Sequence, residues 1–116
     1  MTENGEGMLE GLFGNRIVEK VLLYLYVYEN GYIREIAGCF GEPPNGIRQQ
    51  LIRLEAGNII SGVQRGKIRL YQFNPRYPFL DELKALIKKA YGVLPEKDLE
   101  RYFRRRTRPR RTGKSQ

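Results

Sequence analysis

The sequence predicts one mainly α-helical domain that contains a small β-hairpin. Its length of 116 residues fits a single compact domain, and 41% hydrophobic residues are enough to fill one core. Apolar residues recur at helical spacing in several separate stretches. Between these stretches, two short runs rich in β-branched and aromatic residues flank Arg65-Gly66, a pattern typical of a hairpin.

The first long helix is predicted to begin after Asn15 and to end at Asn30-Gly31, because Asn is a good N-terminal cap and Asn-Gly favours a turn. Apolar residues cover most of its circumference. Such a helix is buried on more than one side, either in the core or against a second subunit. Its tyrosines are expected to make core or subunit contacts rather than to stack on bases.

A second helix of about two turns is predicted over residues 32–40. Ile33, Ile36 and Phe40 have helical spacing there, and Gly41 with the prolines that follow it breaks the chain. Cys39 lies on this helix and is expected to be a small core residue.

A third helix is predicted from Pro44 to about Gly57, since proline suits the first helical turn. Aliphatic residues repeat at i, i+4 and i+7 and point inward. The inward stripe consists of Ile47, Leu51 and Leu54, and the outward face of Asn45, Arg48, Gln49, Ile52 and Arg53. This short helix therefore combines an apolar inner side with an outer side rich in Arg, Gln and Asn.

The outward residues have the chemistry that reads DNA bases. Arg48 can bridge O6 and N7 of guanine, and Gln49 can bridge N6 and N7 of adenine. Asn45 can contact a base or a phosphate. For Arg48 and Arg53, an ordinary solvated helix face is the alternative interpretation.

The predicted hairpin carries three basic residues around its bend. Arg65, Lys67 and Arg69 are spaced so that at least two of them face the same side. Contact with phosphates is the expectation there, with base recognition secondary. Charges that prevent strand pairing at an edge are the alternative interpretation, above all for Lys67.

Two further helices are predicted after the hairpin. An amphipathic helix over residues 78–92 ends at Gly92. Pro95 then starts a short helix that can seat Leu99, Tyr102 and Phe103, and we expect it to pack on the domain or to form part of a dimer interface.

The order helix, short helix, turn, helix, hairpin is that of a winged helix-turn-helix. From Leu12 to Gly92 the chain resembles the winged-helix DNA-binding domains of the ArsR-like regulators, including those paired with nucleotidyltransferases. The matching segments are LFGNRIVEKVLLYL, YIREIAGCFG, IRQQLIRLE, RGKIRLYQFN and YPFLDELKALIKKAYG. The resemblance implies that helix 44–57 enters the major groove and that a wing at residues 65–69 contacts the backbone.

These boundaries divide the chain into four parts. Residues 1–11 are expected to be a flexible N-terminus, 12–92 the winged-helix domain, 93–106 a C-terminal helix, and 107–116 a basic flexible tail without apolar residues.

Three residues depart from the pattern of this group or need an explanation. Asn58 stands where Gly is usual, and Asn tolerates the left-handed conformation that ends a helix. Pro43 replaces the usual Ser or Thr cap. Gly46 either permits close approach to the DNA backbone or is merely a poor helix former. The metal ligands of the sensing members are missing, since the chain has one Cys and no His, and no cofactor is expected.

Charge is distributed unevenly along the chain, whose net charge is +8. Residues 1–40 carry −3, residues 41–76 carry +4, residues 77–103 are neutral, and residues 104–116 carry +7. This pattern is typical of a polyanion binder. In the tail, Arg106, Arg108 and Arg110 are spaced as in a minor-groove hook, but Thr107 replaces its glycine, so a generic electrostatic arm is the preferred interpretation.

Composition excludes several classes of protein. Without His and with Cys39 alone, the chain does not fit a disulfide-stapled secreted module, a zinc finger or a His-dependent hydrolase. It lacks a phosphate-cradling glycine-rich loop and an acid/base pair, so we expect no enzyme. The N-terminus is acidic and the longest apolar run has eight residues, so a cytoplasmic protein without a membrane anchor is expected.

The leading hypothesis is a sequence-specific, homodimeric transcriptional regulator that binds double-stranded DNA. A winged-helix interaction module that partners a nucleotidyltransferase-like protein is one alternative. A nucleic-acid binder of low sequence specificity, driven by the tail, is the other.

Overall fold

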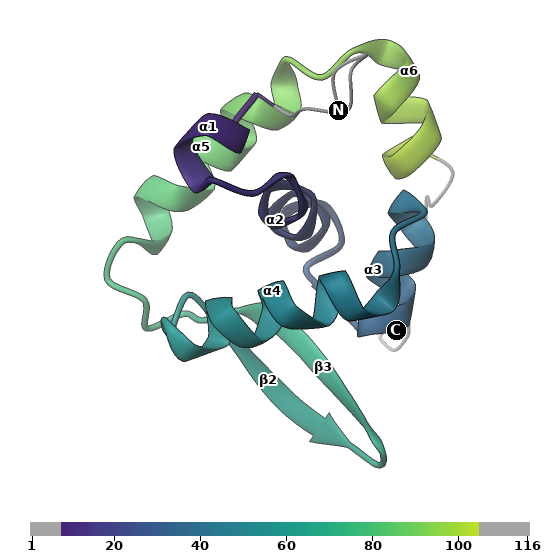
Figure 1. The fold of residues 1–116 in the computed structure, drawn as a ribbon. Helices are drawn as coiled ribbons and strands as arrows, with labels where there is room; N and C mark the ends of the chain where they lie inside the picture. The colour runs from purple at the N-terminus through teal and green to yellow at the C-terminus, as the bar shows by residue number, and fades with distance from the viewer. Residues whose placement is uncertain (1–7, 105–116) are drawn as a thin grey trace, which may run out of the picture.

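The computed structural model describes residues 8–104 and confirms a mainly helical domain with a small antiparallel sheet (Figure 1). The elements are α1 (Glu10–Phe13), α2 (Arg16–Tyr28), β1 (Asn30–Gly31), α3 (Ile33–Phe40), α4 (Pro44–Ala56), β2 (Ile60–Arg65), β3 (Ile68–Phe73), α5 (Leu80–Gly92), α6 (Glu96–Asp98) and the π-helix η1 (Leu99–Arg104). None of the helices in residues 8–104 is both long enough and apolar enough to cross a membrane.

Helix α2 lies in the middle of the domain (Figure 1) and is capped as expected. The Asn15 side chain accepts hydrogen bonds from the backbone N–H groups of Ile17 and Val18. All eight residues from Val18 to Leu25 are buried, because α1, α3, α4, α5 and the sheet all pack on this helix. One chain therefore covers the helix on every side, and its apolar circumference requires no second subunit.

The end of α2 differs from the expected turn. Glu29 ends the helix with a φ of 75°, and Asn30–Gly31 form strand β1, paired with Gln72 and Tyr71 of β3. The strand order is β1-β3-β2. Gly31 is needed at this position, since a Cβ atom there would lie 2.6 Å from the Tyr24 ring. Strand β1 cannot be predicted from local sequence, because its pairing partner is some 40 residues away.

Helices α3 and α4 form the helix-turn-helix, with the predicted ends. Pro43 precedes α4 without a side-chain cap, and Pro44 occupies the first turn. Asn58 has a φ of 64°, which confirms the left-handed residue expected after this helix. At Gly46, a Cβ atom would lie 3.2 Å from the Ile17 side chain. Gly46 therefore lets α4 lie close to α2, and its suggested approach to DNA stays a prediction.

A partly buried ion cluster, in which the Arg16 side chain is exposed, joins the turn between α3 and α4 to α2. The Glu42 carboxylate accepts a hydrogen bond of 2.6 Å from Lys20 Nζ and also pairs with Arg16. Lys20 and Glu42 each leave only 8% of the side chain exposed. Burial would raise the pKa of Glu42, but the hydrogen bonds and charges of Arg16 and Lys20 outweigh it and lower that pKa.

The C-terminal segment is helical after Pro95, as the sequence predicts, and changes from α-helix in α6 to π-helix in η1. Phe103 is buried in the core, and the ring of Tyr102 lies 5.0 Å from that of Phe40. Tyr28 Oη and Cys39 Sγ donate hydrogen bonds to the Tyr102 carbonyl. The backbone of this π-helix thus accepts hydrogen bonds from α2 and α3 of the same chain.

The N-terminal helix α1 corrects the flexible assignment for part of residues 1–11. Leu9 N–H donates to the Glu19 carboxylate, which joins the start of α1 to the first turn of α2. Glu19 is fully buried. Burial raises its pKa, and the nearby Glu10 acts in the same direction, against the hydrogen bond from Leu9.

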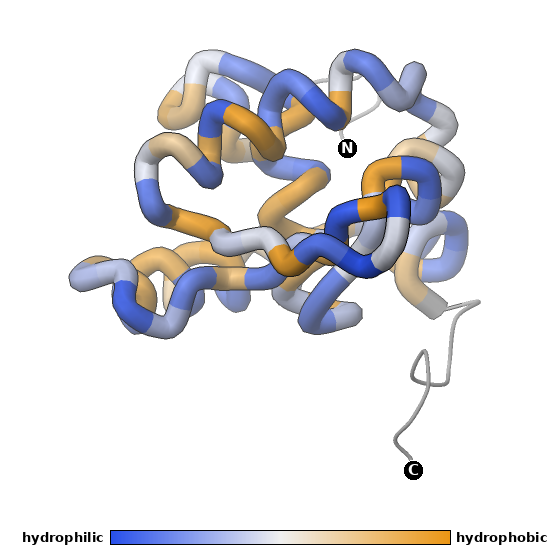
Figure 2. Tube along the Cα trace, turned by 90° about the horizontal axis from the view of Figure 1, so that it is seen from below, coloured by the Kyte–Doolittle hydropathy of each residue, from blue (hydrophilic) through white to orange (hydrophobic). Residues whose placement is uncertain are grey.

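Hydrophobic and hydrophilic residues alternate along the helices, as amphipathic packing around α2 requires (Figure 2). The core residues of α4 are Ile47, Leu51 and Leu54, the three that the sequence predicts. Those of the sheet are Ile60, Tyr71 and Phe73.

Candidate nucleic-acid interface

The outward face of α4 presents the polar residues that the sequence singles out. Asn45, Arg48, Gln49 and Arg53 are all exposed, on the side of the helix opposite its buried stripe. Asn45 and Gln49 are four residues apart and so lie above one another on the surface. Arg53 is near the end of the helix and donates a hydrogen bond to Gln50. The outward face is thus available along its whole length.

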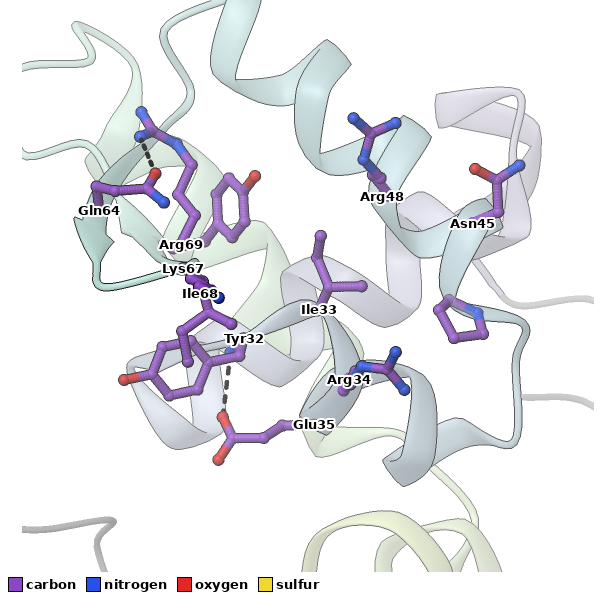
Figure 3. A pocket seen from close by; sticks show the side chains of 12 residues that line it. Tyr32, Ile33, Arg34, Glu35, Asn45, Arg48, Gln64, Lys67, Ile68 and Arg69 are labelled. Carbon is purple, nitrogen blue, oxygen red and sulfur yellow. Dashed lines mark hydrogen bonds between the residues drawn. The ribbon is translucent and has the colours of Figure 1, made fainter.

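A hollow of about 640 Å³ separates the start of α4 from the wing formed by β2 and β3 (Figure 3). Polar side chains from the start of α3, from α4 and from the wing line it, one of them acidic: Tyr32, Arg34, Glu35, Asn45, Arg48, Gln64, Lys67 and Arg69. Side chains from three parts of the chain that are separated in sequence therefore lie on one surface of the domain. Gln49, Arg53 and Arg65 do not line this hollow, although all three are exposed.

Arg34, like Gln64, lines the hollow but is not among the contacts predicted from the sequence. It is exposed on the first turn of α3 and lines the hollow with Arg48 and Lys67 (Figure 3). Its position could have been inferred from the helix-turn-helix pattern, because the first turn of the leading helix borders the second helix. Three cations from three elements thus face the same space.

Arg69 differs from the other predicted contacts, because the chain itself provides its counter-ion. Its guanidinium pairs with Glu55 of α4 at 2.5 Å and also donates to Gln64. The hydrogen bond with Glu55 raises the already high pKa of Arg69. Arg69 consequently links the wing to α4, and its charge is partly neutralised before any phosphate approaches.

Tyr71 lies beneath this ion pair and is buried. The Arg69 guanidinium is 6.0 Å from the centre of its ring, a cation–π arrangement. Burial is the main cause that raises the pKa of Tyr71, so the phenol remains neutral and gives the hollow a partly aromatic wall.

The basic residues Arg106, Arg108 and Arg110 lie outside the described residues 8–104. Within that range, no three His, Cys, Asp or Glu side chains gather in a way that could hold a metal ion.

Comparisons with known proteins identify the fold. No protein-family model matches the sequence, and no curated protein is similar to it in sequence. Two solved structures of a ZitR double mutant from Lactococcus lactis are similar, each with 14% identity. One has a TM-score of 0.50 over 72% of this chain and 64% of the ZitR chain. The apo form has a TM-score of 0.51 over 78% of both chains.

The chain has a winged helix-turn-helix fold. The adhesin competence repressor AdcR from Streptococcus pyogenes matches with a TM-score of 0.45 and 12% identity over 72% of this chain. The expected fold class is confirmed by the ZitR structures, with α5, α6 and η1 as the additional C-terminal helices. The assignment to the ArsR-like group stays a prediction.

Proposed function

We propose that this protein is a sequence-specific DNA-binding transcriptional regulator. Helix α4 reads the major groove over residues 44–57, and the wing contacts the backbone over residues 65–69. The convergence of Arg34, Arg48 and Lys67 on one hollow carries the proposal, because cations from three elements suit a phosphate backbone that passes between helix and wing. Membership of the ArsR-like group and a cytoplasmic location belong to the same proposal.

The two sets of basic residues have different roles in this proposal. Arg48 and Gln49 lie near the N-terminal end of α4 and have the donors that pair bidentately with guanine and adenine. Arg34, Arg65 and Lys67 neutralise phosphates and contribute affinity for any sequence. No catalytic role is proposed for any residue.

The single substitutions Arg48→Ala and Lys67→Ala are expected to separate these roles. Arg48→Ala should cost ~1–3 kcal/mol at the preferred site and relax the preference at one base pair, whereas Lys67→Ala should weaken all sequences and reduce the salt slope by about 1. Fluorescence anisotropy on a preferred and a random duplex across salt concentrations measures both.

Gln72→Ala is the control for these two variants, since Gln72 is exposed on β3 but does not line the hollow. If Arg48→Ala leaves both affinity and base preference intact, the role of α4 as the recognition helix is refuted. The winged-helix interaction module with a nucleotidyltransferase-like partner then becomes the better explanation.

We also propose that the regulator is a homodimer. Apolar side chains remain exposed on the helical part of the domain, and Leu12 of α1 is 66% exposed. Phe79 and Val93, at either end of α5, are exposed as well. Tyr102 is a poor target for disrupting a dimer, because its ring and carbonyl already serve the core of one chain.

The mass in solution is expected to be about twice the 13.6 kDa of one chain, and Leu12→Glu should return it to the single-chain value. Light scattering after size exclusion measures the mass, with Val63→Glu on the wing as the control. A parent protein that runs as one chain at micromolar concentration refutes the dimer.

A further inference from the structure

Ile52 is an apolar residue in the middle of the otherwise polar outward face of α4. Its exposed fraction is 47%, and it is the only large hydrophobic residue of α4 among the exposed ones in residues 8–104. The residues four and three positions before it are Arg48 and Gln49, and the next residue is Arg53. Ile52 therefore lies on the same helical surface as the residues proposed to read bases.

Neither helix formation nor core packing explains an isoleucine at this position. A β-branched residue lowers helix stability relative to Ala or Leu at an exposed site. The core stripe of α4 is already complete with Ile47, Leu51 and Leu54. The polar and charged neighbours of Ile52 on the helix also argue against an apolar patch for a protein partner.

On the basis of the function proposed above, we propose that Ile52 recognises the C5-methyl group of a thymine in the major groove. That methyl group is the only apolar feature by which the groove distinguishes base pairs, and an aliphatic side chain is the natural contact for it. Arg48 and Ile52 would then form one reading unit, in which a guanidinium recognises guanine and a sec-butyl group recognises thymine.

The helical geometry sets the spacing of the two bases. Four residues of α-helix rise about 6 Å, and successive base pairs are about 3.4 Å apart. With α4 lying along the groove, the thymine recognised by Ile52 is therefore expected about two base pairs from the guanine recognised by Arg48. The proposal thus predicts the position of the thymine as well as its identity.

Replacing single thymines by deoxyuridine tests the proposal, since deoxyuridine keeps the base pairing and the O4 acceptor but lacks the methyl group. The probe is a duplex enriched by the parent protein from a random 20-base-pair library. At one thymine, the substitution should weaken binding by the parent about three- to five-fold, as the loss of one buried methyl group implies. Ile52→Ala should bind the thymine and uracil duplexes equally.

Val63→Ala is the matched control, because Val63 is also an apolar side chain with 46% exposure but lies on the wing. It should retain the parent's preference for thymine. Ile52→Ala is expected to fold normally, since alanine is the stronger helix former at an exposed position, and circular dichroism checks this.

The outcomes separate this inference from the function on which it rests. If the parent is insensitive to deoxyuridine at every position, or if Ile52→Ala keeps the preference, the role of Ile52 is refuted and the DNA-binding function stands. If no duplex is enriched and all sequences bind equally, sequence-specific recognition itself is refuted, and the role of Ile52 with it.

Discussion

Replacement of Glu42 by alanine is expected to destabilise the protein by ~3–5 kcal/mol, because it leaves the buried ammonium group of Lys20 without its counter-ion. A domain of this size has a total stability of ~5–15 kcal/mol, so the variant should lose a large share of its stability. Glu42 also joins α2 to the turn before α4. The loss should therefore first disorder α4, the helix proposed to contact DNA. Urea denaturation followed by circular dichroism measures the change.

Glu55→Ala is the matched control, since it also removes the acid from an ion pair that involves α4. Glu55 and Arg69 are 30% and 36% exposed, whereas Glu42 and Lys20 are 8% exposed. Partly solvated pairs contribute only ~0.2–1 kcal/mol. Equal losses of stability in the two variants would contradict the structural role assigned to Glu42.

The effect of Glu42→Ala should also depend on pH. The pKa of Glu42 is lowered in the folded protein, so its stabilising contribution is present above the ordinary pKa of glutamate and is lost as the pH falls through the folded value. The parent and the variant should therefore converge in strong acid. The raised pKa of Glu19 has the opposite effect on the pH dependence of stability. The folded protein holds the Glu19 proton more tightly than the unfolded chain does, and the stabilisation that this gives is lost as the pH rises.

Removal of residues 105–116 is expected to have the largest effect on DNA affinity. The cut falls after Arg104, the last residue of η1, and spares the buried Phe103, so stability should barely change. It removes six basic residues and lowers the net charge from +8 to +2. If about five of these charges contact phosphates, the plot of log affinity against log salt should lose ~4–5 units of slope.

The loss should be equal on preferred and random duplexes, because an arm that contacts only phosphates carries no base recognition. A comparison of A·T-rich and G·C-rich duplexes of equal length controls for the minor-groove interpretation of Arg106, Arg108 and Arg110. A loss confined to A·T-rich DNA would favour that interpretation. An unchanged salt slope would show that residues 105–116 serve a partner other than DNA.

Local sequence signals determined the helices, the hairpin and the fold class. The Asn15 cap, the inward stripe of α4 and the left-handed Asn58 all occur where the sequence predicts them. Gly66, with a φ of 63°, forms the predicted bend of the wing. Each of these features depends on residues within about four positions of one another, and a periodicity or a cap reports this range directly.

The tertiary structure alone decided which side chains meet. β1 exists because Asn30 and Gly31 find β3, and Arg69 is neutralised because Glu55 is 14 residues away in sequence but adjacent in space. Arg34 joins Arg48 for the same reason. Local sequence does not show which of the predicted basic residues are paired with an acid. Spacing along the chain indicates their charge and exposure, but not the counter-ion that another element supplies. Long-range packing therefore separates exposed basic residues from those whose charge is already paired within the fold.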